Sequence, residues 1–183
     1  MTMRNSQFAM RNGKSLYNIT LTALLAAFIT VFTAYVGHFP LPGGGGAYLH
    51  FGDSLIFLAA CLLPAPYAVL AGALGAGLAD VLTAPLYILP TVLIKACVAL
   101  CFSAKREKIV CARNIAALLP ACVITLAGYF AARLLLLSDW RAALVSNLTG
   151  DLVQWLGSAL IFLALGLVMD RGGLKRKLRG WRK

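Results

Sequence analysis

Five charged side chains lie within, or at the edges of, otherwise apolar stretches of this chain: Asp53, Asp80, Lys95, Arg133 and Asp151. An isolated charge inside a hydrocarbon layer is energetically costly, so each of these residues requires a partner, water or a function. The lysine and the arginine suit a carboxylate, whereas the aspartates suit hydroxyl or amine groups. The set predicts either a polar binding site or ion pairs that neutralise one another and hold a bundle together.

A second group of polar residues lies near the C-terminus with helical spacing. Intervals of four, three and four residues place the group on one face of a helix: Asn147, Asp151, Gln154 and Ser158. Aromatic side chains that can stack on a flat ligand fall at about the same level of the predicted bundle: Tyr48, Tyr87, Trp140 and Trp155. The other halves of the apolar stretches carry almost nothing comparable. This asymmetry predicts a water-accessible cavity that opens to one side of a membrane.

His50 stands three residues before Asp53. This spacing allows an acid–base pair or half of a metal site. However, the chain has only one other histidine, and it has neither a His-Glu-x-x-His nor a Gly-x-Ser-x-Gly motif. The simpler interpretation is a helix start, with Asp53 near the positive end of the helix dipole. We therefore expect no bound metal and no enzymatic activity.

The composition indicates an integral membrane protein. Hydrophobic residues make up 61% of the chain, and its mean hydropathy is +0.83, above the range of ordinary soluble domains. Six apolar stretches predict membrane-spanning helices at residues 17–36, 51–63, 67–83, 86–104, 114–137 and 143–169. The expected fold class is an all-α, six-helix transmembrane bundle. It occupies residues 17–170 of a single membrane domain, between tails at residues 1–16 and 171–183.

The distribution of basic residues predicts the orientation. Most of the 17 lysines and arginines lie in the N-terminal tail, at residues 105–113 and in the C-terminal tail. If the chain crosses six times, these three regions share one side, and the positive-inside rule makes that side the cytoplasm. The net charge of +11 then reflects anchoring at lipid headgroups, so we expect no nucleic-acid partner. The N-terminal tail has no convincing signal cleavage site, and we expect it to be retained.

Glycine, proline and small residues define further features. The prolines and glycines at residues 40–46 cannot continue a helix, so an outside loop is expected to fold over the bundle. Small residues spaced by three and four along residues 67–83 predict close helix packing. One stripe on the first stretch fits another membrane helix, either in this bundle or on a partner: Thr20, Ala23, Ala27, Thr30 and Ala34. The five cysteines lie within apolar stretches or near the basic loop at residues 105–113, so no disulfide framework is expected.

Four segments resemble the S components of energy-coupling factor (ECF) transporters, the small membrane subunits that bind vitamins. They are residues 23–27 (ALLAA), 48–54 (YLHFGDS), 71–80 (AGALGAGLAD) and 89–95 (LPTVLIK). The resemblance covers nearly the whole chain and is closest to the branch with pantothenate, hydroxymethylpyrimidine and riboflavin-type S components. It implies a six-helix bundle in the bacterial plasma membrane, with an outward-facing site covered by the loop after the first helix.

The resemblance also implies partners. The face with Ala23 and Ala27 would dock on a transmembrane T component, which is driven by two cytoplasmic ATPase subunits. The S component would topple within the membrane and carry its ligand inward. This chain contains no Gly-x-x-x-x-Gly-Lys-Ser/Thr motif, so ATP would be used by the partner subunits, and we expect no cofactor on this chain.

The expected ligand is a compact polar vitamin or precursor; pantothenate, a pyrimidine and a pyridoxine-like ring all fit. Two other hypotheses remain open. A structural protein of the cell-shape type would have six spans without a cavity, and an intramembrane enzyme would need Asp80 and Asp151 to face each other across water. The residues expected to bind substrate are Tyr48, His50, Asp53, Asp80, Tyr87, Lys95, Arg133, Asn147, Asp151, Gln154 and Trp155.

Overall fold

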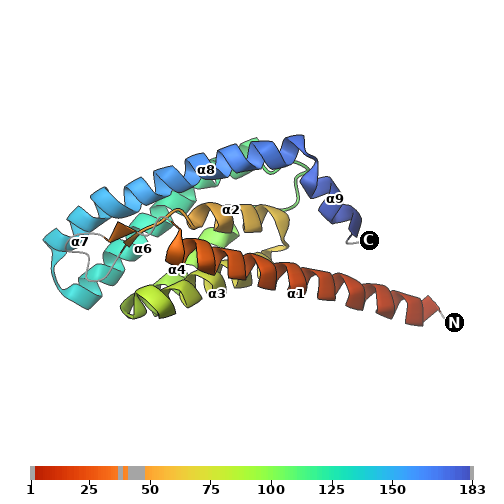
Figure 1. Ribbon diagram of the computed structural model, residues 1–183, viewed down its shortest axis with the longest axis horizontal. Helices are drawn as coiled ribbons and strands as arrows, with labels where there is room; N and C mark the ends of the chain where they lie inside the picture. Colours follow the sequence, from red (N-terminus) through yellow and green to blue (C-terminus); the bar gives the residue numbers. More distant parts are fainter. Residues whose placement is uncertain (1–2, 37–38, 41–47, 182–183) are drawn as a thin grey trace.

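The computed structural model describes residues 3–36, 39–40 and 48–181. Long helices run along the long axis of the molecule, and the two ends of the chain lie at the same end of the bundle (Figure 1). The principal helices are α1 (Met3–Tyr35), α2 (Asp53–Leu62), α3 (Ala65–Thr83), α4 (Ile88–Cys101), α6 (Leu118–Leu137) and α8 (Leu152–Arg171). Shorter elements are β1 (Phe39–Pro40), β2 (Tyr48–Leu49), η1 (Pro85–Tyr87), α5 (Ala112–Ala116), α7 (Trp140–Ser146), η2 (Asn147–Asp151) and α9 (Leu174–Trp181).

Each of the six predicted apolar stretches contains a helix. Within the described residues, four helical segments are long and apolar enough to cross a membrane: Gly13–Tyr35, Ala65–Thr83, Ala112–Leu137 and Trp140–Arg171. The apolar helices Asp53–Leu62 and Pro85–Cys101 are shorter. A helix perpendicular to the bilayer needs about 20 residues to cross it. The all-helical bundle is confirmed. Whether the chain crosses four or six times depends on whether the two short helices span the membrane.

Local sequence explains where several of these helices begin and end. Pro66 lies in the first turn of α3, where a missing backbone N–H costs nothing. Ser138 adopts a left-handed backbone conformation (φ 54°) and ends α6. Asp139 then caps α7, its side chain accepting hydrogen bonds from the backbone N–H groups of Arg141 (2.9 Å) and Ala142 (3.1 Å). The predicted turn at residues 138–142 is thus shorter than expected, because the cap starts α7 at Trp140.

Helices α1 and α3 pack closely through small residues, as the spacing predicted. A Cβ added at Gly75 would lie 2.7 Å from the Cβ of Ile29 and 2.8 Å from the carbonyl oxygen of Ala26. The Thr30 hydroxyl donates a hydrogen bond to the carbonyl oxygen of Gly75 (2.9 Å). The two backbones therefore approach too closely for a larger residue at position 75.

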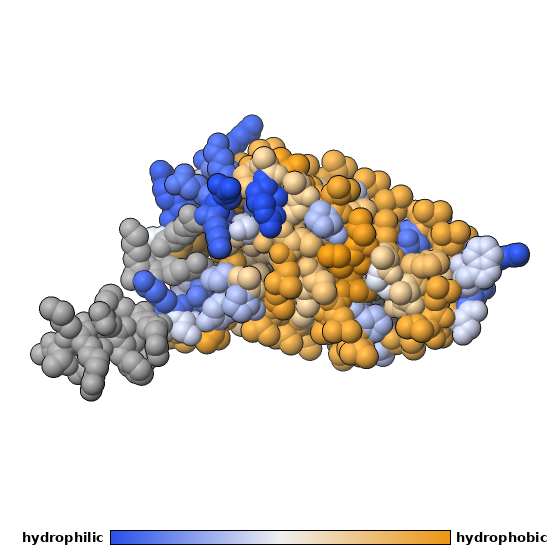
Figure 2. All heavy atoms as spheres, turned by 180° about the vertical axis from the view of Figure 1, so that it is seen from behind, coloured by the Kyte–Doolittle hydropathy of each residue, from blue (hydrophilic) through white to orange (hydrophobic). Residues whose placement is uncertain are grey.

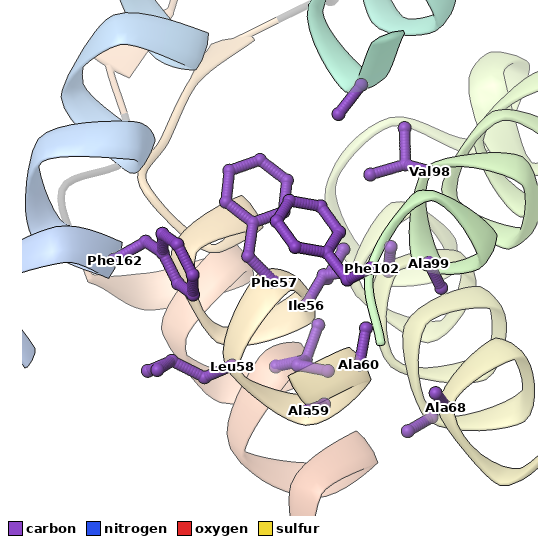
Figure 3. Packing of buried hydrophobic residues seen from close by; sticks show 14 of the residues in the cluster. Ile56, Phe57, Leu58, Ala59, Ala60, Ala68, Val98, Ala99, Phe102 and Phe162 are labelled. Atoms are coloured by element: carbon purple, nitrogen blue, oxygen red, sulfur yellow. The ribbon is translucent and has the colours of Figure 1, made fainter. Parts of the chain in front are cut away.

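An aromatic cluster fills the core of the bundle (Figure 3). Phe57 of α2 stacks on Phe102 with ring centroids 4.9 Å apart. Phe162 of α8 meets both rings edge-on, at 5.9 Å and 5.6 Å. Buried alanines and aliphatic residues of α2, α3 and α4 surround the cluster. Because Phe102 directly follows α4, the cluster closes the bundle near the basic loop.

The basic loop is attached to the end of α8. The carboxylate of Asp170 accepts hydrogen bonds from the backbone N–H groups of Ile109 (2.8 Å) and Val110 (2.9 Å). The buried Asn114 side chain joins Ser103 to Ile109. We call this end of the molecule, with residues 105–113 and α9, the basic end. Figure 2 shows a broad hydrophobic surface between a strongly hydrophilic end and a smaller hydrophilic group opposite.

Candidate functional site

A cavity lies at the end of the bundle opposite the basic end. Its volume is about 30 Å³, room for one or two ordered water molecules. Helices α3, α4, α6 and α8 contribute walls, together with η1, η2 and His50. Its lining residues are His50, Asp80, Ala84, Tyr87, Thr91, Tyr129, Arg133, Asp151 and Gln154. All of these side chains are buried in the protein.

The structure brings together six of the residues that were expected to bind substrate: His50, Asp80, Tyr87, Arg133, Asp151 and Gln154. Asp53, Lys95 and Asn147 do not line the cavity but hydrogen-bond within the network around it. Trp155 packs, partly buried, against the apolar core. Tyr48 belongs to β2, and its side chain lies outside the described part of the structure. Trp140 is 57% exposed and away from the cavity lining, as expected of an interfacial residue.

An ion pair between α6 and η2 forms one wall. Both terminal nitrogens of Arg133 donate to the carboxylate of Asp151, Nη2 to Oδ1 at 2.9 Å and Nη1 to Oδ2. Asn147 Nδ2 donates to the same carboxylate (3.0 Å) and to the carbonyl oxygen of Leu126 (2.8 Å). Both charged side chains are almost completely buried. The pair is therefore a fixed, two-pronged contact of the kind that arginine and carboxylate groups form best.

A second ion pair joins α2 to α4. Lys95 Nζ lies 2.8 Å from each carboxylate oxygen of Asp53, and both residues are at most 1% exposed. Gln154 connects this pair to the cavity wall. Its Nε2 donates to Asp53 (3.3 Å), and its Oε1 accepts from the backbone N–H of His50 (3.3 Å). Four of the five charges thus neutralise one another in pairs, one of the two alternatives that the sequence left open.

Tyr129 lies between the two cations and was not predicted as a site residue. Its ring centroid is 5.0 Å from Lys95 Nζ and 5.8 Å from Arg133 Cζ, within the range of cation–π attraction. Its hydroxyl shares a hydrogen bond with Thr91 Oγ1 (3.0 Å). The sequence did contain a signal for Tyr129 and Thr91. Each stands four positions before a charged residue, Tyr129 before Arg133 and Thr91 before Lys95, and so shares its helical face.

The polar face of the last apolar stretch is confirmed, but its helix is not regular. Asn147, Asp151, Gln154 and Ser158 are all buried on one side. However, residues 147–151 form a π-helical turn, η2, between α7 and α8. Such turns add a residue to the helical repeat and are frequent at functional sites. Here the turn carries Asp151 at the cavity wall, next to Asn147.

His50 has a structural role at the start of α2. Its Nδ1 accepts a hydrogen bond from the backbone N–H of Gly52 (3.1 Å). A Cβ added at Gly52 would lie 2.0 Å from Thr33 Oγ1, so this position requires glycine. No cluster of three metal-binding side chains occurs among the described residues. This geometry corresponds to the helix start favoured from the sequence.

The small-residue stripe of α1 is divided between two environments. Thr30 contacts α3 and Ala34 is 5% exposed, so this part packs within the bundle. Thr20, Ala23 and Ala27 are exposed on the outer surface of α1. Ala23 and Ala27 therefore remain accessible to a partner helix.

Comparison with known proteins adds an independent finding. The family model described as "ECF-type riboflavin transporter, S component" matches residues 13–171. A search of curated proteins gave no match. The matched region includes all six apolar helical segments and every described residue that lines the cavity. The chain therefore belongs to the family of ECF transporter S components.

Proposed function

We propose that this chain is the high-affinity substrate-binding subunit of an ECF-type importer. It captures a water-soluble vitamin or vitamin precursor from outside the cell and delivers it inward with a T component and two ATPase subunits. Membership of a transporter family supports this role rather than an enzymatic one.

The observation that carries the proposal is the cavity. Its lining combines two tyrosines with hydrogen-bonding and charged side chains, the mixture expected of a site for a small, flat, polar molecule. A structural protein of the cell-shape type would need no such cavity. The cavity measures about 30 Å³ in this closed arrangement, so a vitamin-sized ligand would enter only if the side chains that line it move apart.

We further propose six membrane crossings with both termini in the cytoplasm of a bacterial cell. The basic end would face the cytoplasm under the positive-inside rule, and the cavity would face outward. Helices α2 and α4 are short, and the residues that flank them would complete each crossing. Each helix occupies a predicted span, and the two are joined by the buried Lys95–Asp53 pair.

The exposed positions Ala23 and Ala27 are proposed as the docking face for the T component. Small side chains let two helix backbones approach closely in a membrane, where packing drives helix association. Their exposure on α1 leaves this face free for such contact.

Thermal unfolding of the purified protein with a panel of vitamins and precursors tests the binding function. A ligand present at 100 times its Kd should stabilise the folded protein by about 2.7 kcal/mol. One compound, or one chemically related group, should raise the unfolding temperature in a concentration-dependent manner. If no compound has any effect, the substrate-binding role is wrong and the structural alternative gains support.

A further inference from the structure

Both cations that were expected to meet a substrate carboxylate already have carboxylate partners. Lys95 is completely buried, contacts both oxygens of Asp53 and is not among the residues that line the cavity. Arg133 does line the cavity, but both of its terminal nitrogens donate to Asp151. A substrate carboxylate could form a two-pronged contact with the terminal nitrogens of Arg133 only by displacing Asp151.

That displacement is unfavourable for two reasons. First, Asp151 is 4% exposed, so the displaced carboxylate would lose its partner inside the protein. Second, Asp80 and Asp151 both line the cavity, and a third carboxylate beside them would be repelled across a medium of low dielectric constant. Among the described lining residues, Arg133 is the single arginine or lysine that could offset this repulsion.

The same groups suit an uncharged substrate. The carboxylate oxygens accept hydrogen bonds from hydroxyl or N–H donors. Arg133 Nε is buried without a hydrogen-bond partner in the described structure, and it can donate to a neutral oxygen or ring nitrogen while the pair with Asp151 stays intact. The tyrosine rings of the lining provide apolar contact for a ring.

We infer that Asp151 is a specificity-determining residue that excludes carboxylate-bearing substrates, because it neutralises Arg133 and occupies both terminal nitrogens that would bind a substrate carboxylate. This inference rests on the proposed substrate-binding function. It goes further by assigning the charge class of the ligand and the residue that selects it.

Matched ligand pairs, measured by isothermal titration calorimetry, test the inference. Each pair has a similar skeleton and differs in one carboxylate: pantothenol and pantothenate, pyridoxine and 4-pyridoxate, nicotinamide and nicotinate. In the wild-type protein, the neutral member of any pair that binds should bind at least tenfold more tightly, about 1.4 kcal/mol. Asp151→Asn should shift this ratio at least tenfold toward the carboxylate, because it frees Arg133.

Asp139→Asn is the matched control. It makes the same substitution at the same end of the molecule, but Asp139 is exposed, lies outside the cavity lining and caps α7. Asparagine caps helices about as well as aspartate, so the wild-type ratio should persist. Should Asp151→Asn fail to fold, Asp151→Thr makes the same test. The preference of the wild-type protein for the neutral member of a pair can be measured without any variant.

The outcomes separate the two claims. Tighter binding of a carboxylate member by the wild-type protein overturns the inference and leaves the substrate-binding function intact. An unchanged ratio in a folded Asp151 variant also overturns it. If a vitamin outside these pairs binds, it is compared with its own matched partner: the amide or alcohol of a carboxylate-bearing vitamin, or a carboxylate analogue of a neutral one. If no vitamin binds at all, the proposed function itself is wrong, and the inference fails with it.

Discussion

At the scale of single residues, the candidate site contains two buried ion pairs, and each aspartate also accepts a hydrogen bond from an amide side chain. Asp53 contacts Lys95 and Gln154, and Asp151 contacts Arg133 and Asn147. Removing one partner of a buried ion pair leaves an uncompensated charge, whereas replacing both with apolar residues is often tolerated. The two pairs therefore contribute to specific packing of the helices as well as to the chemistry of the site.

The Lys95–Asp53 pair gives a direct test of this view. Asp53→Asn should destabilise the protein by about 3–5 kcal/mol, because Lys95 stays buried without a counter-charge. The double variant Asp53→Leu/Lys95→Met should recover most of that loss. Denaturant unfolding in detergent compares the three proteins. Equal stability of Asp53→Asn and the wild type would show that the pair does not hold α2 to α4.

At the scale of helices, close approach of small residues positions the walls of the site. Gly75→Ala should destabilise the protein by about 1–3 kcal/mol, because the new methyl group would overlap Ile29 and the backbone of Ala26. Gly13 provides the control, since it lies in α1 with no heavy atom within 4 Å of an added Cβ. Gly13→Ala should be neutral or stabilising by up to about 1 kcal/mol. Thermal unfolding of both variants measures the difference; similar effects would contradict the packing argument.

The exposed part of the α1 stripe predicts a separation of binding from transport. Ala23→Trp and Ala27→Trp should each abolish vitamin uptake by cells that carry the complete transporter, because indole rings keep the partner helix away. Ligand affinity of the purified variants should be unchanged, since neither residue lines the cavity. Leu24→Trp, at a neighbouring exposed position, is the control and should permit uptake. Normal uptake in both alanine variants would refute the docking face.

The sequence predicted the positions of the helices well and their irregularities poorly. Apolar length directly reports a buried or lipid-facing helix, so α2 and α3 begin and end within about two residues of expectation. The π-helical turn at Asn147–Asp151 was not foreseen, because its spacing also fits a regular helix. The pairing of Lys95 with Asp53 was not foreseen either. Partner choice among five charges depends on distances between helices, which local patterns do not contain.

At the scale of the whole molecule, the distribution of charge predicts the topology. Truncation fusions can determine whether the short helices α2 and α4 cross the membrane. With six crossings, a reporter fused after Leu63 lies in the cytoplasm and one fused after Ala84 lies outside. With four crossings the two positions are reversed. We expect a fluorescent protein to be active after Leu63 and alkaline phosphatase after Ala84; the opposite pattern would contradict six spans.

The central claim is that a small molecule occupies the cavity beside Asp151. Native mass spectrometry of the protein, extracted gently from membranes and supplied with the vitamin panel, tests it most directly. We predict one bound small molecule per chain in the wild type and in the Asp139→Ala control. The folded Asp151→Ala variant should bind at least tenfold more weakly, about 1.4 kcal/mol. An empty wild-type protein, or full occupancy of Asp151→Ala at the same ligand concentration, would contradict the account.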